Sequence, residues 1–141
     1  VLDLFAGTGA LALEALSRGA AHAVMIDRAT HDVLVENARR TKLAQRVELR
    51  RGDVYGHAAE LARAGRTFDL IFADPPYAKG DALRVLRAVD SGVLLAAAGL
   101  FVLEQGAGEE CAEHVGALSL IRERRYGAAR ICFYERREAA I

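Results

Sequence analysis

The sequence predicts an α/β protein with a doubly wound, mainly parallel sheet and an antiparallel hairpin at its C-terminal end. Short apolar segments alternate with helical segments, which is typical of a parallel sheet covered by helices on both faces. A glycine-rich turn joins the first apolar segment to the first helix, as in Rossmann-like folds. The chain has 141 residues, of which 52% are hydrophobic, so we expect one domain, 1–141, with a full core.

The first half of the chain predicts strands that are each followed by a helix. The strand segments are apolar or alternate between apolar and polar residues: 1–5, 23–27 and 47–51. The helical segments carry apolar residues at helical spacing: 10–18, from Thr30 to about 43, and 57–64. Gly19 and Gly65 stand where a glycine commonly ends a helix, and Thr30 is a good N-cap.

The second half predicts a buried fourth strand that begins at Phe68 and leads into Asp74-Pro75-Pro76-Tyr77. The last elements follow in this order: a helix over about 81–89, a strand over 100–104, and hairpin strands over 118–124 and 130–135. A turn at Tyr126-Gly127 joins the two hairpin strands. The predicted sheet is therefore parallel until its antiparallel ending.

Composition excludes several classes of protein. The longest apolar run, 93–103, is too short to span a bilayer, and nothing resembles a secretory signal, so we expect no membrane partner. Cys111 and Cys132 lack metal-ligand spacing and suggest no disulfide framework, which favours a cytoplasmic location; the four histidines are scattered, so we expect no metal site. The chain starts inside the expected first strand, so we expect an N-terminal segment to be missing.

The segment after the fourth strand has the composition of a catalytic site. Two consecutive prolines lack a backbone N–H, so the turn offers hydrogen-bond acceptors and almost no donors. The Asp74 carboxylate and the carbonyls of Asp74 and Pro75 are these acceptors, and Tyr77 adds an aromatic face. Such a clamp suits a planar ligand with an amino group, and a nucleobase is the obvious candidate. A strand that simply ends in a proline turn is the alternative.

The glycine-rich turn fits two kinds of cofactor. Gly7-Thr8-Gly9 with Ala12 matches the dinucleotide fingerprint, and Asp27 follows at the expected distance, so a nicotinamide dehydrogenase is a fair rival. Asp3 decides between them, because its carboxylate would repel a pyrophosphate but attract the ammonium and sulfonium of S-adenosylmethionine.

The acids at the next strand ends fit the same adenosyl ligand. Asp27 can accept from the ribose hydroxyls, and Asp53 can accept from the adenine amine, with Val54 against the ring. Acids that only cap helices are the alternative interpretation. The expected cofactor-binding residues are Asp3, Phe5, Ala6, Gly7, Thr8, Gly9, Asp27, Arg28, Asp53, Val54 and Asp74.

These residues also carry a resemblance that covers essentially the whole chain. The chain resembles the bacterial 16S rRNA guanine-N2 methyltransferases (the RsmD type) in these segments: 1–11, 13–20, Asn37, Asp74-Pro75-Pro76-Tyr77, Tyr126-Gly127 and Phe133-Tyr134. The run Glu14-Ala15-Leu16-Ser17-Arg18-Gly19 is the more specific part. Ala128-Ala129 departs from the polar residue common after Tyr-Gly, and the family's N-terminal segment is not in the sequence.

The resemblance implies an enzyme that transfers a methyl group from S-adenosylmethionine to the N2 amine of a guanine in small-subunit rRNA. Asp74, Pro75 and Tyr77 would be catalytic, and the partner would be this rRNA or an assembling 30S particle, bound by a cytoplasmic monomer. An adenine-N6 methyltransferase acting on DNA or RNA, and a non-catalytic S-adenosylmethionine-binding module, are the alternatives.

Arginines concentrate in the C-terminal hairpin. The segment 118–137 holds six arginines and two glutamates, although the whole chain has a formal net charge of zero. Basic side chains on one element can contact RNA phosphates. A solvated hairpin face is the alternative interpretation.

Overall fold

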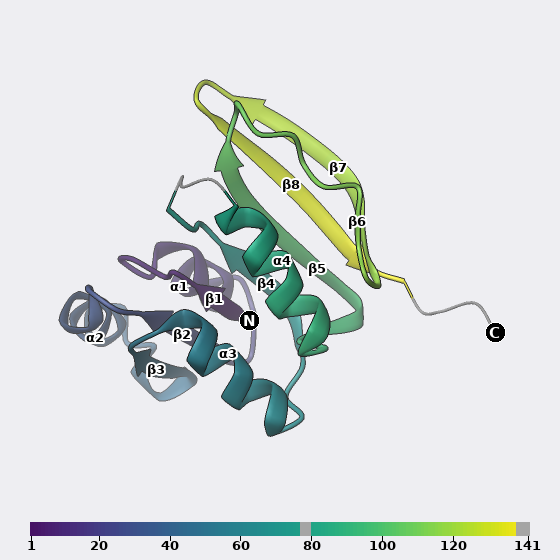
Figure 1. Ribbon diagram of the computed structural model, residues 1–141. Coiled ribbons are helices and arrows are strands. Elements are labelled where there is room, and N and C mark those ends of the chain that lie inside the picture. Colours follow the sequence, from purple (N-terminus) through teal and green to yellow (C-terminus); the bar gives the residue numbers. More distant parts are fainter. Residues whose placement is uncertain (77–79, 138–141) are drawn as a thin grey trace.

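The computed structural model describes residues 1–76 and 80–137 (Figure 1). Within these residues, eight strands form a single sheet in the order β3-β2-β1-β4-β5-β8-β7-β6. The strands are β1 (Leu2–Leu4), β2 (Ala23–Asp27), β3 (Val47–Arg51), β4 (Phe68–Ala73), β5 (Leu95–Gly106), β6 (His114–Val115), β7 (Leu118–Tyr126) and β8 (Ala129–Arg136). The helices are α1 (Ala10–Ser17), α2 (His31–Arg40), α3 (Val54–Arg63) and α4 (Asp81–Ser91), with a 3₁₀ turn at Ala44–Arg46.

The first five strands are parallel. From β1 the chain adds β2 and β3 on one side and then returns to add β4 and β5 on the other, so the strand order reverses at β1. This strand pairs with β2 on one side and β4 on the other, so that Asp3 is in register with Met25 and Phe72. Open α/β sheets bind ligands outside the carboxyl ends of their strands at such a switch point. The predicted doubly wound, mainly parallel sheet with an antiparallel ending is confirmed.

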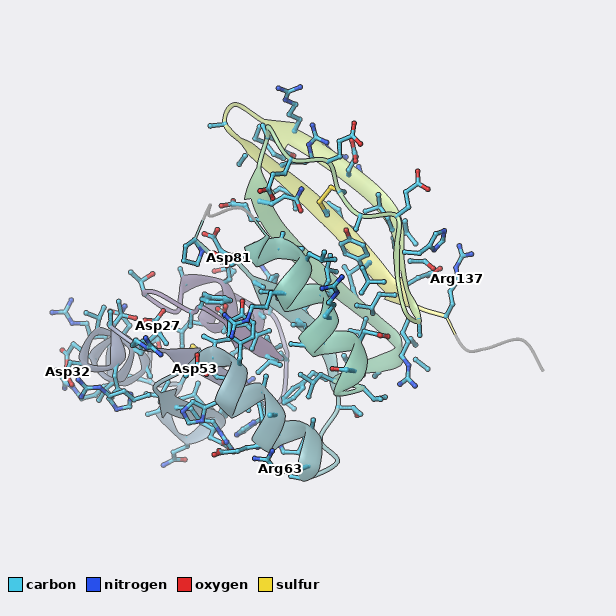
Figure 2. All side chains as sticks on the ribbon, in the orientation of Figure 1. Asp27, Asp32, Asp53, Arg63, Asp81 and Arg137 are labelled. Atoms are coloured by element: carbon cyan, nitrogen blue, oxygen red, sulfur yellow. A yellow bond between two sulfur atoms is a disulfide. The ribbon has the colours of Figure 1, made fainter. Side chains whose placement is uncertain are left out.

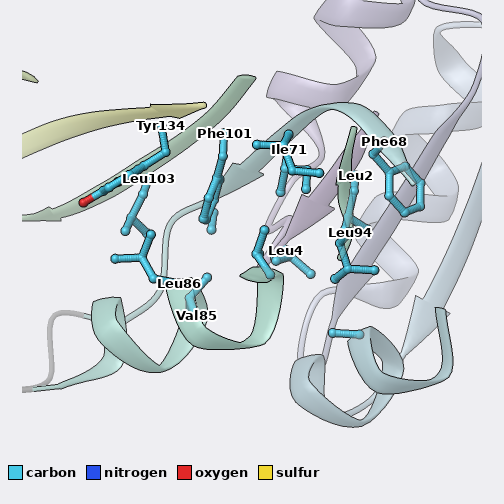
Figure 3. Packing of buried hydrophobic residues seen from close by; sticks show 14 of the residues in the cluster. Leu2, Leu4, Phe68, Ile71, Val85, Leu86, Leu94, Phe101, Leu103 and Tyr134 are labelled. Carbon is cyan, nitrogen blue, oxygen red and sulfur yellow. The ribbon is translucent and has the colours of Figure 1, made fainter. Parts of the chain in front are cut away.

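Successive side chains of the buried strands point to alternate faces of the sheet, and they form one hydrophobic core on each face. Leu2 and Leu4 of β1 pack with α3 and α4 in the larger core, together with Phe101 and Tyr134 of the later strands (Figure 3). Ala23 and Met25 of β2 point to the other face and pack against α1 and α2. Asp3 lies between Leu2 and Leu4, so its side chain leaves β1 on the face opposite the larger core.

Some boundaries differ from the sequence predictions for identifiable reasons. The third helix begins at Val54 instead of 57, because the Asp53 carboxylate caps it by accepting the Gly56 N–H at 2.9 Å. The second helix ends at Arg40 instead of about 43, and a 3₁₀ turn follows at Ala44–Arg46. The fifth strand begins at Leu95 instead of 100, in a segment whose three alanines do not favour a strand from sequence.

The antiparallel strands extend the sheet beyond α4, at the opposite edge from β3 (Figure 1). Strand β8 pairs with both β5 and β7. Strand β6 pairs only with Leu118 and Ser119 of β7. The Leu120 N–H donates to the Glu113 carbonyl at 2.9 Å. Among the described residues, β7 therefore has an open hydrogen-bonding edge from Ile121 to Tyr126, where its side chains are exposed.

A disulfide bond joins Cys111 to Cys132, with the Cα atoms 6.1 Å apart. The expectation that these cysteines form no disulfide is wrong. Cys132 lies in β8 opposite Leu103 of β5, and the chain that leaves β5 returns across this position before β6. The fold thus brings together two residues 21 positions apart, and the adjacent Tyr134 hydroxyl donates to the Ala112 carbonyl at 2.8 Å. Both links tie the connection after β5 to β8.

No helix in the described parts of the chain is long and apolar enough to cross a membrane.

Candidate active site

The strand order brings carboxylates together along one edge of the sheet. Each of the five parallel strands, from β3 to β5, has an acid at or near its carboxyl end. In spatial order across the sheet they are Asp53, Asp27, Asp3, Asp74 and Glu104. Parallel strands end at the same edge, so these side chains face a common region although they are far apart in the sequence.

A cavity of about 740 Å³ lies at this edge. Asp27 and Asp53 stand on one side of it, at neighbouring strand ends, and Asp81 of α4 lines it as well (Figure 2). The predicted site residues that line the cavity are Phe5, Gly7, Asp27, Arg28, Asp53, Val54, Asp74 and Pro75. Thr8 instead lines a neighbouring hollow of about 490 Å³ between α1 and α2. Tyr77 lies outside the described residues.

The glycine-rich loop packs closely on the core beneath it. Gly7 and Gly9 both have positive φ angles, 59° and 81°, which glycine adopts without steric cost. A Cβ atom at Gly9 would lie 2.8 Å from Leu34 Cδ2 and 3.1 Å from Met25 Sδ, so a larger residue would displace the loop. Phe5 also has a positive φ angle, 64°, an unusual conformation for a bulky residue and one that tends to occur at functional sites.

Asp27 holds the loop in place at the end of β2. Its Oδ2 accepts the Gly7 N–H at 2.9 Å, and its Oδ1 accepts the N–H groups of Ala29 and Thr30. Burial alone would raise the pKa of Asp27, but these hydrogen bonds outweigh it and lower the pKa below its usual value. The carboxylate therefore remains ionised and presents a fixed acceptor at the cavity wall.

Asp53 has a structural task as well as a place at the cavity. Its Oδ2 caps α3, and its Oδ1 lies 3.6 Å from Arg28 Nη2 in an exposed ion pair. The helix-capping alternative is therefore correct for one of its oxygens. The other oxygen faces Arg28, which also lines the cavity.

Asp3 is the least satisfied acid of the series. Its side chain is 3% exposed, and among the described residues its Oδ2 has no hydrogen-bond partner. Burial raises the pKa of Asp3 to about 7, and the charges of Asp27 and Asp74 contribute to the shift. A buried carboxylate oxygen without a partner is costly unless a donor or cation compensates it. The site thus fits a cationic ligand and disfavours a phosphate.

Asp74 meets a second acid, Glu104, which is not among the site residues predicted from the sequence. Ala73 of β4 is in register with Leu103 of β5, so the following residues, Asp74 and Glu104, are neighbours and their side chains are hydrogen-bonded. Loss of surrounding water and this contact with Glu104 raise the pKa of Asp74 to about 6. Glu104 ends the hydrophobic run 100–103, and that pattern was the available signal.

Two residues on the larger-core side of the cavity, Tyr55 and Arg84, were not predicted as site residues. The Arg84 guanidinium lies 3.7 Å from the centre of the Tyr55 ring, and this ring meets Phe5 edge-on with centroids 6.1 Å apart. All three residues line the cavity. The sequence offered no signal for this arrangement, because the helices that supply Tyr55 and Arg84 meet only in the folded protein.

Comparison with known proteins identifies the relatives of this chain. Residues 1–135 match the family described as "Conserved hypothetical protein 95". The chain belongs to this family. It is 33% identical over 138 residues to "Putative rRNA methyltransferase YlbH" of Bacillus subtilis, covering 96% of this chain and 75% of the relative. It is 34% identical over 139 residues to "Ribosomal RNA small subunit methyltransferase D" of Escherichia coli, covering 96% and 67%.

Solved structures agree with this assignment. "Putative methyltransferase yhhF from Escherichia coli" has a TM-score of 0.84 and 31% identity, over 96% of this chain and 74% of that one. A conserved hypothetical protein of Streptococcus pyogenes has a TM-score of 0.83 and 31% identity, over 97% and 84%. The predicted membership of the RsmD-type methyltransferases and the Rossmann-like fold are confirmed.

Proposed function

We propose that this protein transfers a methyl group from S-adenosylmethionine to the exocyclic N2 amine of a guanine in small-subunit rRNA. The observation that carries the proposal is the buried Asp3 carboxylate at the switch point, whose Oδ2 has no hydrogen-bond partner among the described residues and suits the ammonium of this cofactor. Its relatives are named rRNA methyltransferases, and one of them is a small-subunit enzyme.

The acids of the first three strands in the row would hold the cofactor. Asp3 would pair with the ammonium, and the fixed carboxylate of Asp27 would accept from the ribose hydroxyls. Val54 and Asp53 would meet the adenine, with Arg28 beside them. The glycine-rich loop that approaches the cofactor completes the set of binding residues: Phe5, Ala6, Gly7, Thr8 and Gly9. When bound, S-adenosylmethionine supplies a methyl group on a positively charged sulfur.

The acceptors after β4 would aim the target amine at that methyl group. The lone pair of a base amine is delocalised into the ring, which makes the amine a weak nucleophile. Hydrogen bonds from its N–H groups to Asp74 and to the Pro75 carbonyl would localise the lone pair and orient it, and Tyr77 would stack on the base. As the nitrogen–carbon bond forms, the carbon–sulfur bond breaks, and the amine releases one proton towards the Asp74 carboxylate. Orientation of this kind contributes roughly 7–11 kcal/mol in favourable cases.

The alternatives predict different chemistry at the same edge. A nicotinamide dehydrogenase would place a pyrophosphate near Asp3, which is repulsive in a buried site. An adenine-N6 methyltransferase would use the same Asp74 clamp and would differ only in the methylated base. A non-catalytic module would need the cofactor site but not the acceptors that follow β4.

We further propose that the substrate is the rRNA within an assembling 30S particle, met in the cytoplasm by a monomer. The exposed arginines of β7, Arg122, Arg124 and Arg125, would contact phosphates of this RNA. A target base in a helix must first be extruded, at a cost of a few kcal/mol, and stacking on Tyr77 would return about 1–3 kcal/mol of it.

Mass spectrometry of nucleosides tests the proposal. Small-subunit rRNA, free or in particles, is incubated with the full-length enzyme and S-adenosylmethionine carrying a labelled methyl group. We expect label in N2-methylguanosine. Label in N6-methyladenosine, or none in any nucleoside, would refute the proposal. Asp27→Ala should weaken cofactor binding by about 1–3 kcal/mol in calorimetry, because it removes a charged acceptor.

A further inference from the structure

Glu104 extends the row of acids past the catalytic Asp74, on the side away from the cofactor. Across the sheet, Asp53, Asp27 and Asp3 precede Asp74, and Glu104 follows it on β5. The register of β4 and β5 fixes this neighbour relation, because Phe72 pairs with Val102 and Ala73 with Leu103. Glu104 is half-buried and is held from its other side by β8, where it is in register with Ile131. The position of its carboxylate is therefore set by paired strands on both sides.

The contact between Asp74 and Glu104 indicates which hydrogen-bonding groups a ligand must present to this pair. Two carboxyl groups hydrogen-bond to each other only when one of them carries a proton. When that proton is lost, the same two groups become a pair of adjacent acceptors with like charges. A ligand that presents two neighbouring N–H donors would satisfy both carboxylates at once. A ligand with a donor beside an acceptor would leave one carboxylate facing a lone pair.

The Watson–Crick edges of the bases differ in this respect. Guanine carries N1–H directly beside its N2 amine, so it offers adjacent donors. Adenine places the N1 acceptor beside its N6 amine, and cytosine places the N3 acceptor beside its N4 amine. Enzymes that modify extruded bases read them through hydrogen bonds to this edge. A site with two adjacent carboxylates is therefore matched to guanine among the bases that carry an amine.

We infer that Glu104 is a specificity-determining residue that accepts a hydrogen bond from guanine N1–H while Asp74 accepts from the N2 amine. The inference rests on the proposed function, since it concerns the base that enters the same site. Glu104 would also increase electron density on the ring as N2 attacks, because its charge lies against N1–H. Adenine would be rejected by repulsion between its N1 lone pair and the Glu104 carboxylate, whereas Asp74 alone would accept either amine.

The test uses a base that keeps the amine and loses the neighbouring donor. 2-Aminopurine has the C2 amine of guanine but no hydrogen on N1. The methylated nucleotide is first located with the wild-type full-length enzyme, and small-subunit rRNA is then prepared with guanine or 2-aminopurine at that position. We expect wild-type kcat/KM to be at least about a hundredfold lower with 2-aminopurine, because a site built for a hydrogen bond rejects an analogue that lacks it.

Glu104→Gln should reduce this preference. A glutamine amide can accept from guanine N1–H or donate to the bare N1 of 2-aminopurine, so the ratio of the two kcat/KM values should fall at least about tenfold. Glu110→Gln is the matched control, because Glu110 follows the same strand, is exposed, and loses the same charge. The control should keep the wild-type ratio. Melting temperature and cofactor affinity, measured for both variants, separate base reading from misfolding.

Two failures can be told apart. If the wild-type enzyme methylates adenine or nothing, the proposed function is wrong. If it methylates guanine N2 but Glu104→Gln keeps the full preference over 2-aminopurine, the assignment of Glu104 is wrong and the function stands. A variant whose melting temperature falls below the assay temperature is replaced by Glu104→Asp, which keeps the acceptor but shortens its reach and should lower kcat/KM with guanine while preserving the preference.

Discussion

The two ends of the sheet are built by different rules. From β3 to β5 the strands run parallel, are mostly buried between helices, and end at one edge. From β8 to β6 they alternate in direction, and the outer part of β7 is exposed. Parallel strands collect their carboxyl ends at one place, whereas antiparallel strands send them to opposite edges. The candidate chemistry therefore gathers in the parallel part, and the antiparallel part supplies support and an outer surface.

Each part is also held together differently. In the parallel part, Asp27 fixes the glycine loop through hydrogen bonds to backbone N–H groups, and the loop packs on Leu34 and Met25. In the antiparallel part, a disulfide and the Tyr134 hydroxyl join the connection after β5 to β8. The first arrangement holds the glycine loop beside the cavity, and the second fixes the strand that lies beside Glu104.

The largest effect should come from Asp74, the proposed catalytic residue of the parallel part. Asp74→Ala should slow methyl transfer at least about a hundredfold and leave cofactor affinity nearly unchanged, because Asp74 meets the target amine and orientation matters most in the transition state. Single-turnover methyl transfer by the full-length enzyme on its RNA, with calorimetry in parallel, measures both. Near-normal turnover would mean that the active site is elsewhere.

The disulfide should affect stability without touching the chemistry. Replacing Cys111 and Cys132 together by Ser should lower the free energy of unfolding by about 3 kcal/mol, from the chain entropy of the closed loop. Denaturant unfolding under oxidising conditions measures the loss, and a reducing agent should bring the wild type close to the variant. Cofactor affinity at low temperature should be equal in the two proteins. A large loss of affinity would show that the two parts are coupled.

Asp3 should make cofactor binding depend on pH. Its pKa is raised to about 7, so below that pH the neutral acid must lose a proton before it can pair with an ammonium. Affinity for S-adenosylmethionine should therefore fall up to about tenfold per pH unit below pH 7 and level off above it. Asp3→Asn should bind more weakly, with a flat profile in calorimetry between pH 6 and 8.

The same shift has an opposite consequence for the protein without cofactor. The pKa of Asp3 in the folded protein, about 7, exceeds the ordinary value of 3.8. The neutral acid therefore stabilises the fold fully below about pH 3.8, and this contribution is lost as the pH rises from 3.8 through about 7. The free energy of unfolding of Asp3→Asn should decline less than that of the wild type over this interval. Parallel curves would contradict the buried environment described for Asp3.

The smallest effect belongs to the arginines of β7. Replacing Arg124 and Arg125 by Ala should flatten the salt dependence of RNA binding by up to about one unit of slope per lost phosphate contact. Arg63→Ala is the control, because Arg63 lies at the far end of α3, well away from the hairpin (Figure 2). Fluorescence titrations at several salt concentrations give the slopes. Equal slopes would assign the arginines to a solvated face.

Sequence patterns predicted the local elements of both parts better than the contacts between distant segments, for a physical reason. A buried strand, a glycine turn, an amphipathic helix and a hairpin are local patterns, so the elements from β1 to β4 and the β7–β8 hairpin were predicted, and the strand ends gave Asp3, Asp27, Asp53 and Asp74 as candidates. The partner of Cys111, the neighbour of Asp74 and the stacking of Arg84 on Tyr55 depend on which distant segments meet. Only the folded arrangement of strands and helices supplies that information.

The open edge of β7 has a consequence for the behaviour of the protein in solution. An unpaired strand edge is a template for another chain, and this one also exposes Ile121 and Tyr126, which are 48% and 58% accessible. Closely spaced positive charges oppose the approach of a second copy in the same orientation. The arginines of β7 therefore act as a barrier to aggregation, whatever they bind. A variant that loses them should be handled dilute, and light scattering should reveal its self-association before any assay of RNA binding is interpreted.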